Sequence, residues 1–144
     1  MIPLVADTSV LVKFAIEEED SPKAVALLRA AIEGAYHLVA PDFMAIEFAN
    51  VLWKYTTRGI LTEEEGRRHL KRLPVDRIEW LPARMLLADA FRFATEHEVA
   101  VYDAAFLVAA ASLGVDFVTA DEGLHRKVAS RLPWVRLLRD FGEV

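Results

Sequence analysis

The chain has 144 residues, of which 54% are hydrophobic and 27% are charged, a balance typical of a folded globular protein. This length suits one core, so we expect residues 1–144 to form a single domain. The absence of cysteine excludes disulfide bonds, thiolate metal sites and a cysteine nucleophile, and the net charge of −5 argues against a protein that coats nucleic acid.

Short apolar runs alternate with longer helical stretches along the chain. Such runs, rich in branched side chains and without polar alternation, are typical of strands covered on both faces. The runs that predict strands are 2–6, 37–40, 77–81, 116–120 and 135–138. Strands separated by helices pair in parallel, so the predicted fold class is α/β: a three-layer α/β/α domain with a mostly parallel five-stranded sheet.

Capping residues mark where the intervening helices begin and end. Ser21-Pro22 begins a helix that should stop at Gly34. Asp42 is expected to cap a helix that runs to about residue 58, and the T-x-x-E box of Thr62 and Glu65 begins the next one. Three more helices are predicted over residues 83–96, 103–113 and 121–131.

Neither the N-terminus nor the longest apolar stretch of the sequence suggests a membrane protein. The N-terminus, MIPLVADTSV, has no basic flank of the kind that precedes a signal peptide. The longest apolar stretch between acids, residues 104–115, is shorter than the roughly 20 residues that cross a bilayer. We therefore expect a cytoplasmic protein that does not associate with membranes.

Three aspartates lie at predicted junctions between strands and helices. Asp7 follows the first strand, Asp121 follows the fourth, and Asp103 follows the short run EVAVY. In open parallel sheets, sites form beyond the carboxyl ends of the strands. Aspartate is also a favoured N-cap, which stabilises a helix by about 1 kcal/mol, so each residue alone has an ordinary structural explanation.

Glu47 lies in PDFMAIEFANVLW, a helical stretch that is apolar on nearly every side. Such a helix is expected to be buried, and a buried carboxylate needs a cation or a proton. The neighbours of Glu47 on its own face are Asn50, Val51 and Lys54. A pair with Lys54 is one explanation, although close helical pairs are three or four residues apart.

The four acids together predict a metal site. Carboxylates gathered at one end of a sheet cannot all stay ionised unless a positive charge neutralises them. Oxygen ligands without cysteine or a histidine spacing motif suit Mg²⁺ or Mn²⁺. A carboxylate cluster that holds such ions is equipped for phosphoryl transfer, and Thr8, Ser9 and Thr119 could orient its carboxylates.

Four motifs around these acids resemble those of the PIN-domain family, and in particular the toxins of VapBC-type toxin–antitoxin pairs. They are DTSVLVK at 7–13, IEFANVLW at 46–53, YDAAFLVAA at 102–110 and TADEGL at 119–124. The resemblance covers residues 2–138. It implies that Asp7, Glu47, Asp103 and Asp121 are the catalytic and metal-binding acids, with Asp7 and Asp103 the foremost ligands.

The same resemblance implies a function and partners. It points to a Mg²⁺-dependent ribonuclease, with Mn²⁺ as a substitute, in which metal-activated water cleaves RNA. It also implies a homodimer and an antitoxin that places a basic side chain among the acids. A fifth acid of some relatives could correspond to Glu122 or to Asp116.

Two other functions are compatible with parts of the sequence. A PIN fold without catalysis would be an RNA-binding or partner-binding module, although such a module would have no need of all four acids. A phospho-acceptor receiver domain also has an aspartate after its first strand, but it needs an acidic pair there, and this chain has Asp7 alone.

The remaining polar and aromatic groups have ordinary interpretations. The stretch 54–77 carries seven Lys or Arg against four acids, which favours a solvated face over an RNA-binding one. The tryptophans are expected to pack in the core or in a dimer rather than to stack on bases. The histidines, which have no metal-like spacing, are interpreted as surface or boundary residues: His37, His69, His97 and His125.

Overall fold

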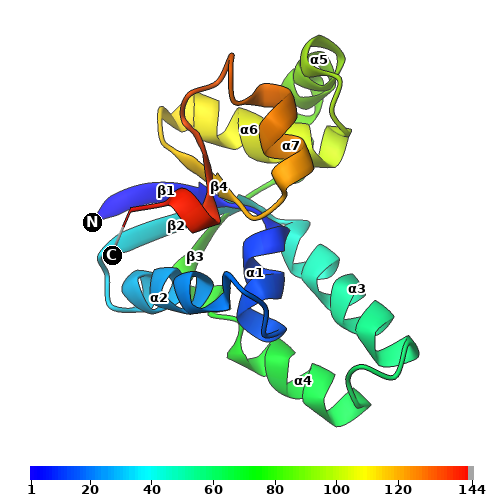
Figure 1. The fold of residues 1–144 in the computed structure, drawn as a ribbon. Helices are drawn as coiled ribbons and strands as arrows, with labels where there is room; N and C mark the ends of the chain where they lie inside the picture. The colour runs from blue at the N-terminus through cyan, green and yellow to red at the C-terminus, as the bar shows by residue number, and fades with distance from the viewer. Residues whose placement is uncertain (143–144) are drawn as a thin grey trace.

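A computed structural model describes residues 1–142 and shows one five-stranded sheet between two layers of helices (Figure 1). The strands are β1 (Ile2–Ala6), β2 (Tyr36–Pro41), β3 (Ile78–Leu81), β4 (Phe117–Thr119) and β5 (Val135–Leu137). The helices are α1 (Thr8–Ala15), α2 (Ser21–Ile32), α3 (Met44–Thr57), α4 (Glu63–Arg72), α5 (Leu87–His97), α6 (Val101–Leu113) and α7 (Glu122–Val128), with short 3₁₀ turns at Val75–Arg77, Ala83–Leu86 and Leu138–Asp140. The predicted α/β/α class is confirmed.

The strand order is β3-β2-β1-β4-β5, and every neighbouring pair is parallel. The order reverses at β1, because the chain moves outward to β2 and β3 and then returns to place β4 on the other side of β1. The reversal leaves a crevice at the carboxyl ends of β1 and β4, which is where open α/β sheets bind ligands.

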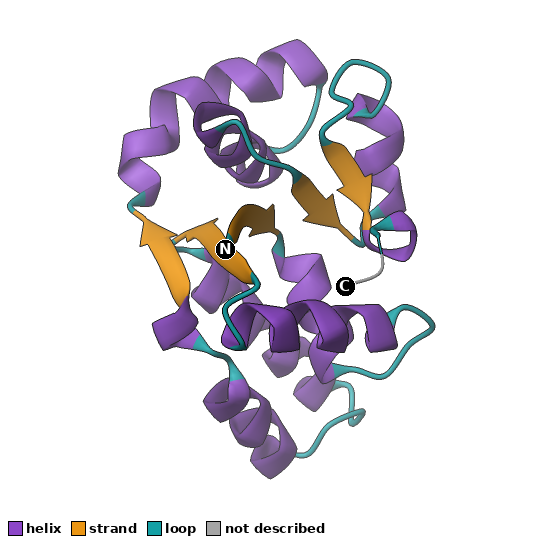
Figure 2. Ribbon diagram, turned by 90° about the vertical axis from the view of Figure 1, so that its left-hand side faces the viewer, coloured by secondary structure: helices purple, strands orange, loops and turns teal. Residues whose placement is uncertain are grey.

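Helices cover both faces of the sheet, so the buried parts of its central strands are mostly apolar. In Figures 1 and 2, α1, α2 and α3 lie on one side and α5, α6 and α7 on the other. Val5, Phe117 and Val118 are fully buried between them. Helix α6 is alanine-rich and buried from Ala104 to Ala110, and these small side chains let it pack closely on β1 and β2.

The structure corrects several local predictions. Helix α1 was not predicted; Asp7 caps it by accepting a hydrogen bond from the Ser9 amide. Asp42 does not cap α3: that helix begins at Met44, and the Asp42 carboxylate accepts instead from the backbone amide of Ala83, 3.2 Å away. The capping box of Thr62 and Glu65 is present as predicted.

Two further predictions, about which side chains are buried, are wrong. Helix α3 is not buried on all sides, since Ile46 is 74% and Trp53 61% exposed. His97 is not a surface residue: it is buried next to Phe93, with 4.7 Å between ring centroids, and its Nδ1 has no hydrogen-bond partner within residues 1–142. Within the same residues, no helix is long and apolar enough to cross a bilayer.

Phe106 ties α6 to the sheet and to the start of α3. Its ring packs edge-to-face against that of Phe43, with 5.5 Å between the ring centroids, and its centroid lies 6.3 Å from that of Phe117 on β4. We expect Phe106→Ala to lower the free energy of unfolding by about 3–5 kcal/mol, as large cavities in cores do. Urea unfolding measures the loss.

Phe91→Ala is the matched control. Phe91 is 68% exposed on α5, so its removal should change the stability by less than about 0.5 kcal/mol. Equal losses for the two variants would mean that Phe106 does not occupy the core position described above.

Candidate active site

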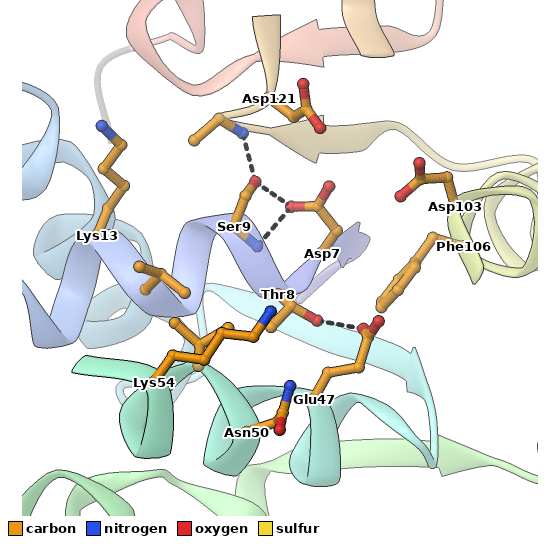
Figure 3. Close-up of a pocket in the computed structure, with 13 residues that line it drawn as sticks. Asp7, Thr8, Ser9, Lys13, Glu47, Asn50, Lys54, Asp103, Phe106 and Asp121 are labelled. Atoms are coloured by element: carbon orange, nitrogen blue, oxygen red, sulfur yellow. Dashed lines mark hydrogen bonds between the residues drawn. The ribbon is translucent and has the colours of Figure 1, made fainter. Parts of the chain in front are cut away.

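A cleft of about 420 Å³ opens at the carboxyl ends of β1 and β4, and all four predicted acids line it. Asp7 follows β1, Asp121 follows β4, Glu47 lies in the first turn of α3 and Asp103 in the first turn of α6 (Figure 3). Residues distant in sequence thus come together at the point where the strand order reverses. The predicted convergence of the four acids in one cleft is present.

Asp7 is the most enclosed and the most firmly held of the four. It is only 5% exposed, and both of its carboxylate oxygens accept hydrogen bonds. The Ser9 amide and hydroxyl donate to Oδ1, the former over 3.1 Å, and the Thr119 hydroxyl donates to Oδ2 over 2.6 Å. Ser9 is itself fixed because its hydroxyl accepts from the Ala120 amide. The ends of β1 and β4 are therefore linked through one carboxylate.

Glu47 is oriented by a side chain from another element. The Thr8 hydroxyl donates to Oε1 of Glu47 over 2.6 Å, which joins α1 to α3 across the cleft (Figure 3). The pair with Lys54 that the helical spacing allowed is not formed. Glu47 is half-buried rather than enclosed, because the rest of α3 leaves one side open to solvent.

Asp103 and Asp121 lie on the other side of the cleft. Asp121 is the N-cap of α7 and accepts from the Leu124 amide over 3.0 Å. Asp103 was predicted to follow a strand, and this is wrong. Val99 and Ala100 form a loop, and α6 begins two residues before Asp103. Its place in the first turn still points its carboxylate toward the cleft.

The acids are close enough to perturb each other electrostatically. Burial raises the pKa of Asp7 to about 7, and the charges of Asp103 and Asp121 add to that rise, while the bonds from Ser9 and Thr119 oppose it. Burial likewise raises the pKa of Asp103, with the charges of Asp121 and Glu47 contributing. A cleft that raises the pKa of its own carboxyl groups favours the arrival of positive charge.

The donor chemistry of the cleft fits a hard divalent cation, since its ligands are carboxylate oxygens. Yet in residues 1–142 no group of three or more His, Cys, Asp or Glu side chains stands close enough together to hold a metal ion. Metal binding would therefore require the carboxylates to draw closer than they lie here. Asp103 is half-buried and Asp121 is exposed, so neither side chain is enclosed on all sides.

The two candidates for a fifth acid lie outside the cleft. Glu122 forms an ion pair with Arg139, and Asp116 pairs with Arg136 over 3.3 Å at the amino end of β4. The lining of the cleft includes neither residue.

Three further polar residues of the cleft were not predicted to belong to the site. Asn50 and Lys54 lie on the same face of α3 as Glu47, and Lys13 comes from α1. The first two were detectable as neighbours of Glu47 at helical spacing. Lys13 was not, because helix α1 was not predicted. The basic residues of α4 do not line the cleft, and an RNA-binding role for them stays a prediction.

The comparisons with known proteins agree with the geometry. A family model described as "PIN domain" matches residues 4–130. The chain belongs to the PIN domain family. It is 35% identical over 130 residues to Ribonuclease VapC3 of Pyrobaculum aerophilum, which covers 86% of this chain and 93% of that protein. Membership of this family rules out the receiver-domain interpretation.

Solved structures show the same fold. PAE2754 from Pyrobaculum aerophilum has a TM-score of 0.65 at 24% identity and covers 88% of this chain and 86% of its own. FitAcB from Neisseria gonorrhoeae has a TM-score of 0.55 at 17% identity, and the match covers 93% of this chain and 95% of that one. At these identities the likeness establishes the arrangement of strands and helices, and the PIN-like fold predicted from the sequence is confirmed.

The raised pKa of Asp7 predicts how stability depends on pH in the absence of metal. The folded chain binds the Asp7 proton more tightly than the unfolded chain, in which the pKa of this aspartate is near its ordinary value of 3.8. Stability from this group is therefore greatest below about pH 4 and decreases up to about pH 7. Asp7→Asn removes the dependence, so its stability relative to the parent should increase by up to about 4 kcal/mol over that range.

Urea unfolding in the presence of a chelator, at several pH values, measures this difference. If the difference between Asp7→Asn and the parent does not change with pH, the carboxyl group does not titrate as described.

Proposed function

We propose that this PIN-domain protein is a divalent-metal-dependent endoribonuclease that uses Mg²⁺, or Mn²⁺ in its place, and that Asp7, Glu47, Asp103 and Asp121 are its catalytic and metal-binding residues. The observation that carries the proposal is the gathering of these four carboxylates in one cleft. The 35% identity to a protein named Ribonuclease VapC3 supports RNA as the substrate. Each turnover would add one water across an RNA phosphodiester bond.

The carboxylates would serve to hold the ion and to keep the reacting phosphate in place. A bound Mg²⁺ or Mn²⁺ would acidify a water molecule and neutralise charge on the phosphate. Ser9 and Thr119 keep both oxygens of Asp7 fixed, and Thr8 fixes Glu47. Groups held in this way lose little freedom when substrate binds, and such preorganisation is a large part of catalysis.

We further propose that the protein is the toxin of a toxin–antitoxin pair, forms a homodimer and resides in the cytoplasm. An acidic cleft on a chain of net charge −5 suits an antitoxin that carries a basic side chain. Exposed apolar residues, among them Phe91 and Tyr102 at 68% and 65%, supply surface for a second copy or a partner. Sedimentation that shows only monomer would remove the dimer from this proposal.

Asp7→Asn should reduce cleavage of RNA by at least roughly 100-fold, because it removes a charged ligand while leaving the side chain the same size. The measurement is cleavage of labelled RNA, and of DNA with the same sequence, over a titration of Mg²⁺ or Mn²⁺. Asp76→Asn is the matched control, since Asp76 is exposed in the turn before β3, away from the cleft.

A variant Asp7→Asn that cuts RNA as fast as the parent, with the same metal requirement, would exclude this mechanism. A parent chain that binds RNA but does not cut it at any metal concentration would favour the alternative, a PIN-fold binding module without catalysis.

Millimolar Mg²⁺ or Mn²⁺ should raise the Tm of the parent, because a ligand bound only by the folded state stabilises it by mass action. At about 100 times the dissociation constant this stabilisation is about 2.7 kcal/mol. Thermal unfolding with and without metal measures it at constant ionic strength.

The same metal should raise the Tm of Asp7→Asn much less. Glu79→Gln, which removes an exposed acid of the edge strand β3 that pairs with His37 of β2, should respond like the parent. An unchanged Tm of the parent would contradict metal binding by the folded chain.

A further inference from the structure

One face of α3 presents three polar side chains in line with the cleft. Glu47, Asn50 and Lys54 are spaced three and four residues apart, which places them above one another on a helix, and all three line the cleft. Figure 3 shows Asn50 and Lys54 continuing the row that begins at Glu47. The cleft therefore has carboxylates at the carboxyl ends of the strands and, on its α3 side, the ammonium group of Lys54, which points toward Thr8 and the acids (Figure 3).

The charge of Lys54 is available to a ligand. Within residues 1–142, Lys54 makes no salt bridge, and neither Lys54 nor Asn50 makes a side-chain hydrogen bond. The other lysine of the cleft, Lys13, differs because it pairs with Glu18. Glu47, the acid nearest to Lys54 in helical spacing, is engaged by Thr8.

A polyanion with regularly spaced charges fits both the acids and the lysine of this cleft. Ions held by the acids would neutralise one phosphate, and Lys54, whose backbone lies about two helical turns from that of Glu47, would reach a neighbouring one. An acidic protein segment fits less well, because the four carboxylates would repel it. Asn50 lies between Glu47 and Lys54 on α3 and can donate a hydrogen bond from its amide.

We propose that the RNA strand runs along α3, and that Lys54 and Asn50 bind a phosphate next to the one at which the chain is cut. This inference rests on the proposed function. It predicts a contact on one side only: the nucleotides on one side of the cleaved bond, and not those on the other, depend on Lys54, and the experiment below determines which side that is.

A structural role for Lys54 gives a different expectation. The last turn of α3 is a favourable place for a cation because of the helix dipole, so Lys54 could act on stability alone. In that case its replacement would lower the Tm and affect all substrates equally.

The test uses an RNA that the parent cuts at a defined bond, and two versions of it. In each version a neutral methylphosphonate replaces the neighbouring phosphate, on the 5′ side or on the 3′ side. Lys54→Gln should raise KM for the all-phosphate RNA roughly 5- to 10-fold, and reduce the slope of log KM against log salt by roughly 0.7. Lys54→Arg should restore most of the loss.

One of the two methylphosphonate RNAs should be cut by the parent and by Lys54→Gln with equal KM, while the other shows the full difference between them. Lys23→Gln, which removes an exposed lysine of α2 outside the cleft, should resemble the parent throughout.

A Lys54→Gln variant with unchanged KM, or with the same loss for all three RNAs, would overturn this inference while leaving the nuclease intact. A parent that cuts none of the RNAs would overturn the proposed function, and the inference with it.

Discussion

The repulsion among four carboxylates at the carboxyl ends of β1 and β4 is the constraint around which the rest of the structure is arranged. Asp7 is nearly enclosed, which makes its ionised form costly, and the neighbouring acids increase that cost. The fold meets the cost with hydrogen bonds from Ser9 and Thr119 and with a pKa high enough to keep a proton near neutrality. A metal ion bound as proposed would relieve the same repulsion, so the cost of ionising Asp7 and the proposed binding of a cation have one cause.

The hydroxyl groups around the cleft connect this electrostatic problem to the fold. Thr119 of β4 and Ser9 of α1 both donate to Asp7, which follows β1 and caps α1. Thr8 of α1 donates to Glu47 of α3. Asp7 and Glu47 are thus held by the same contacts that hold β1 next to β4 and α1 next to α3. Function and packing share these contacts, since a shift of either element would change the distances between carboxylates.

Much of the fold follows from local pattern. Runs of apolar residues identified all five strands, because strands covered on both faces have no polar alternation. The beginning of α3 could not be located in this way, because Asp42 forms a tertiary hydrogen bond to Ala83 instead of a cap. Helix α1 has only eight residues and β-branched side chains at Val10 and Val12, so its local preference is weak and its packing decides.

The acids of the candidate site could be predicted from the residue type and from the positions of the strand ends. Asp7 and Asp121 followed from strand ends, and Glu47 from an acid in an apolar stretch, although that stretch proved half-exposed. Asp103 was found by an incorrect route, since no strand precedes it. Spacing in sequence does not determine how the two lysines of the cleft are paired: Lys13 pairs with Glu18, whereas Lys54 has no salt bridge within residues 1–142.

The order of the strands has a consequence during synthesis of the chain. β1 lies at the centre of the sheet but pairs with β4, whose partner residue Phe117 is more than a hundred positions later than Val5. A nascent polypeptide that ends before Asp121 contains at most three of the four carboxylates and has an open edge at β1. If these acids are the cutting apparatus, a ribosome can add every residue from Met1 to Ala120 before the four of them can assemble.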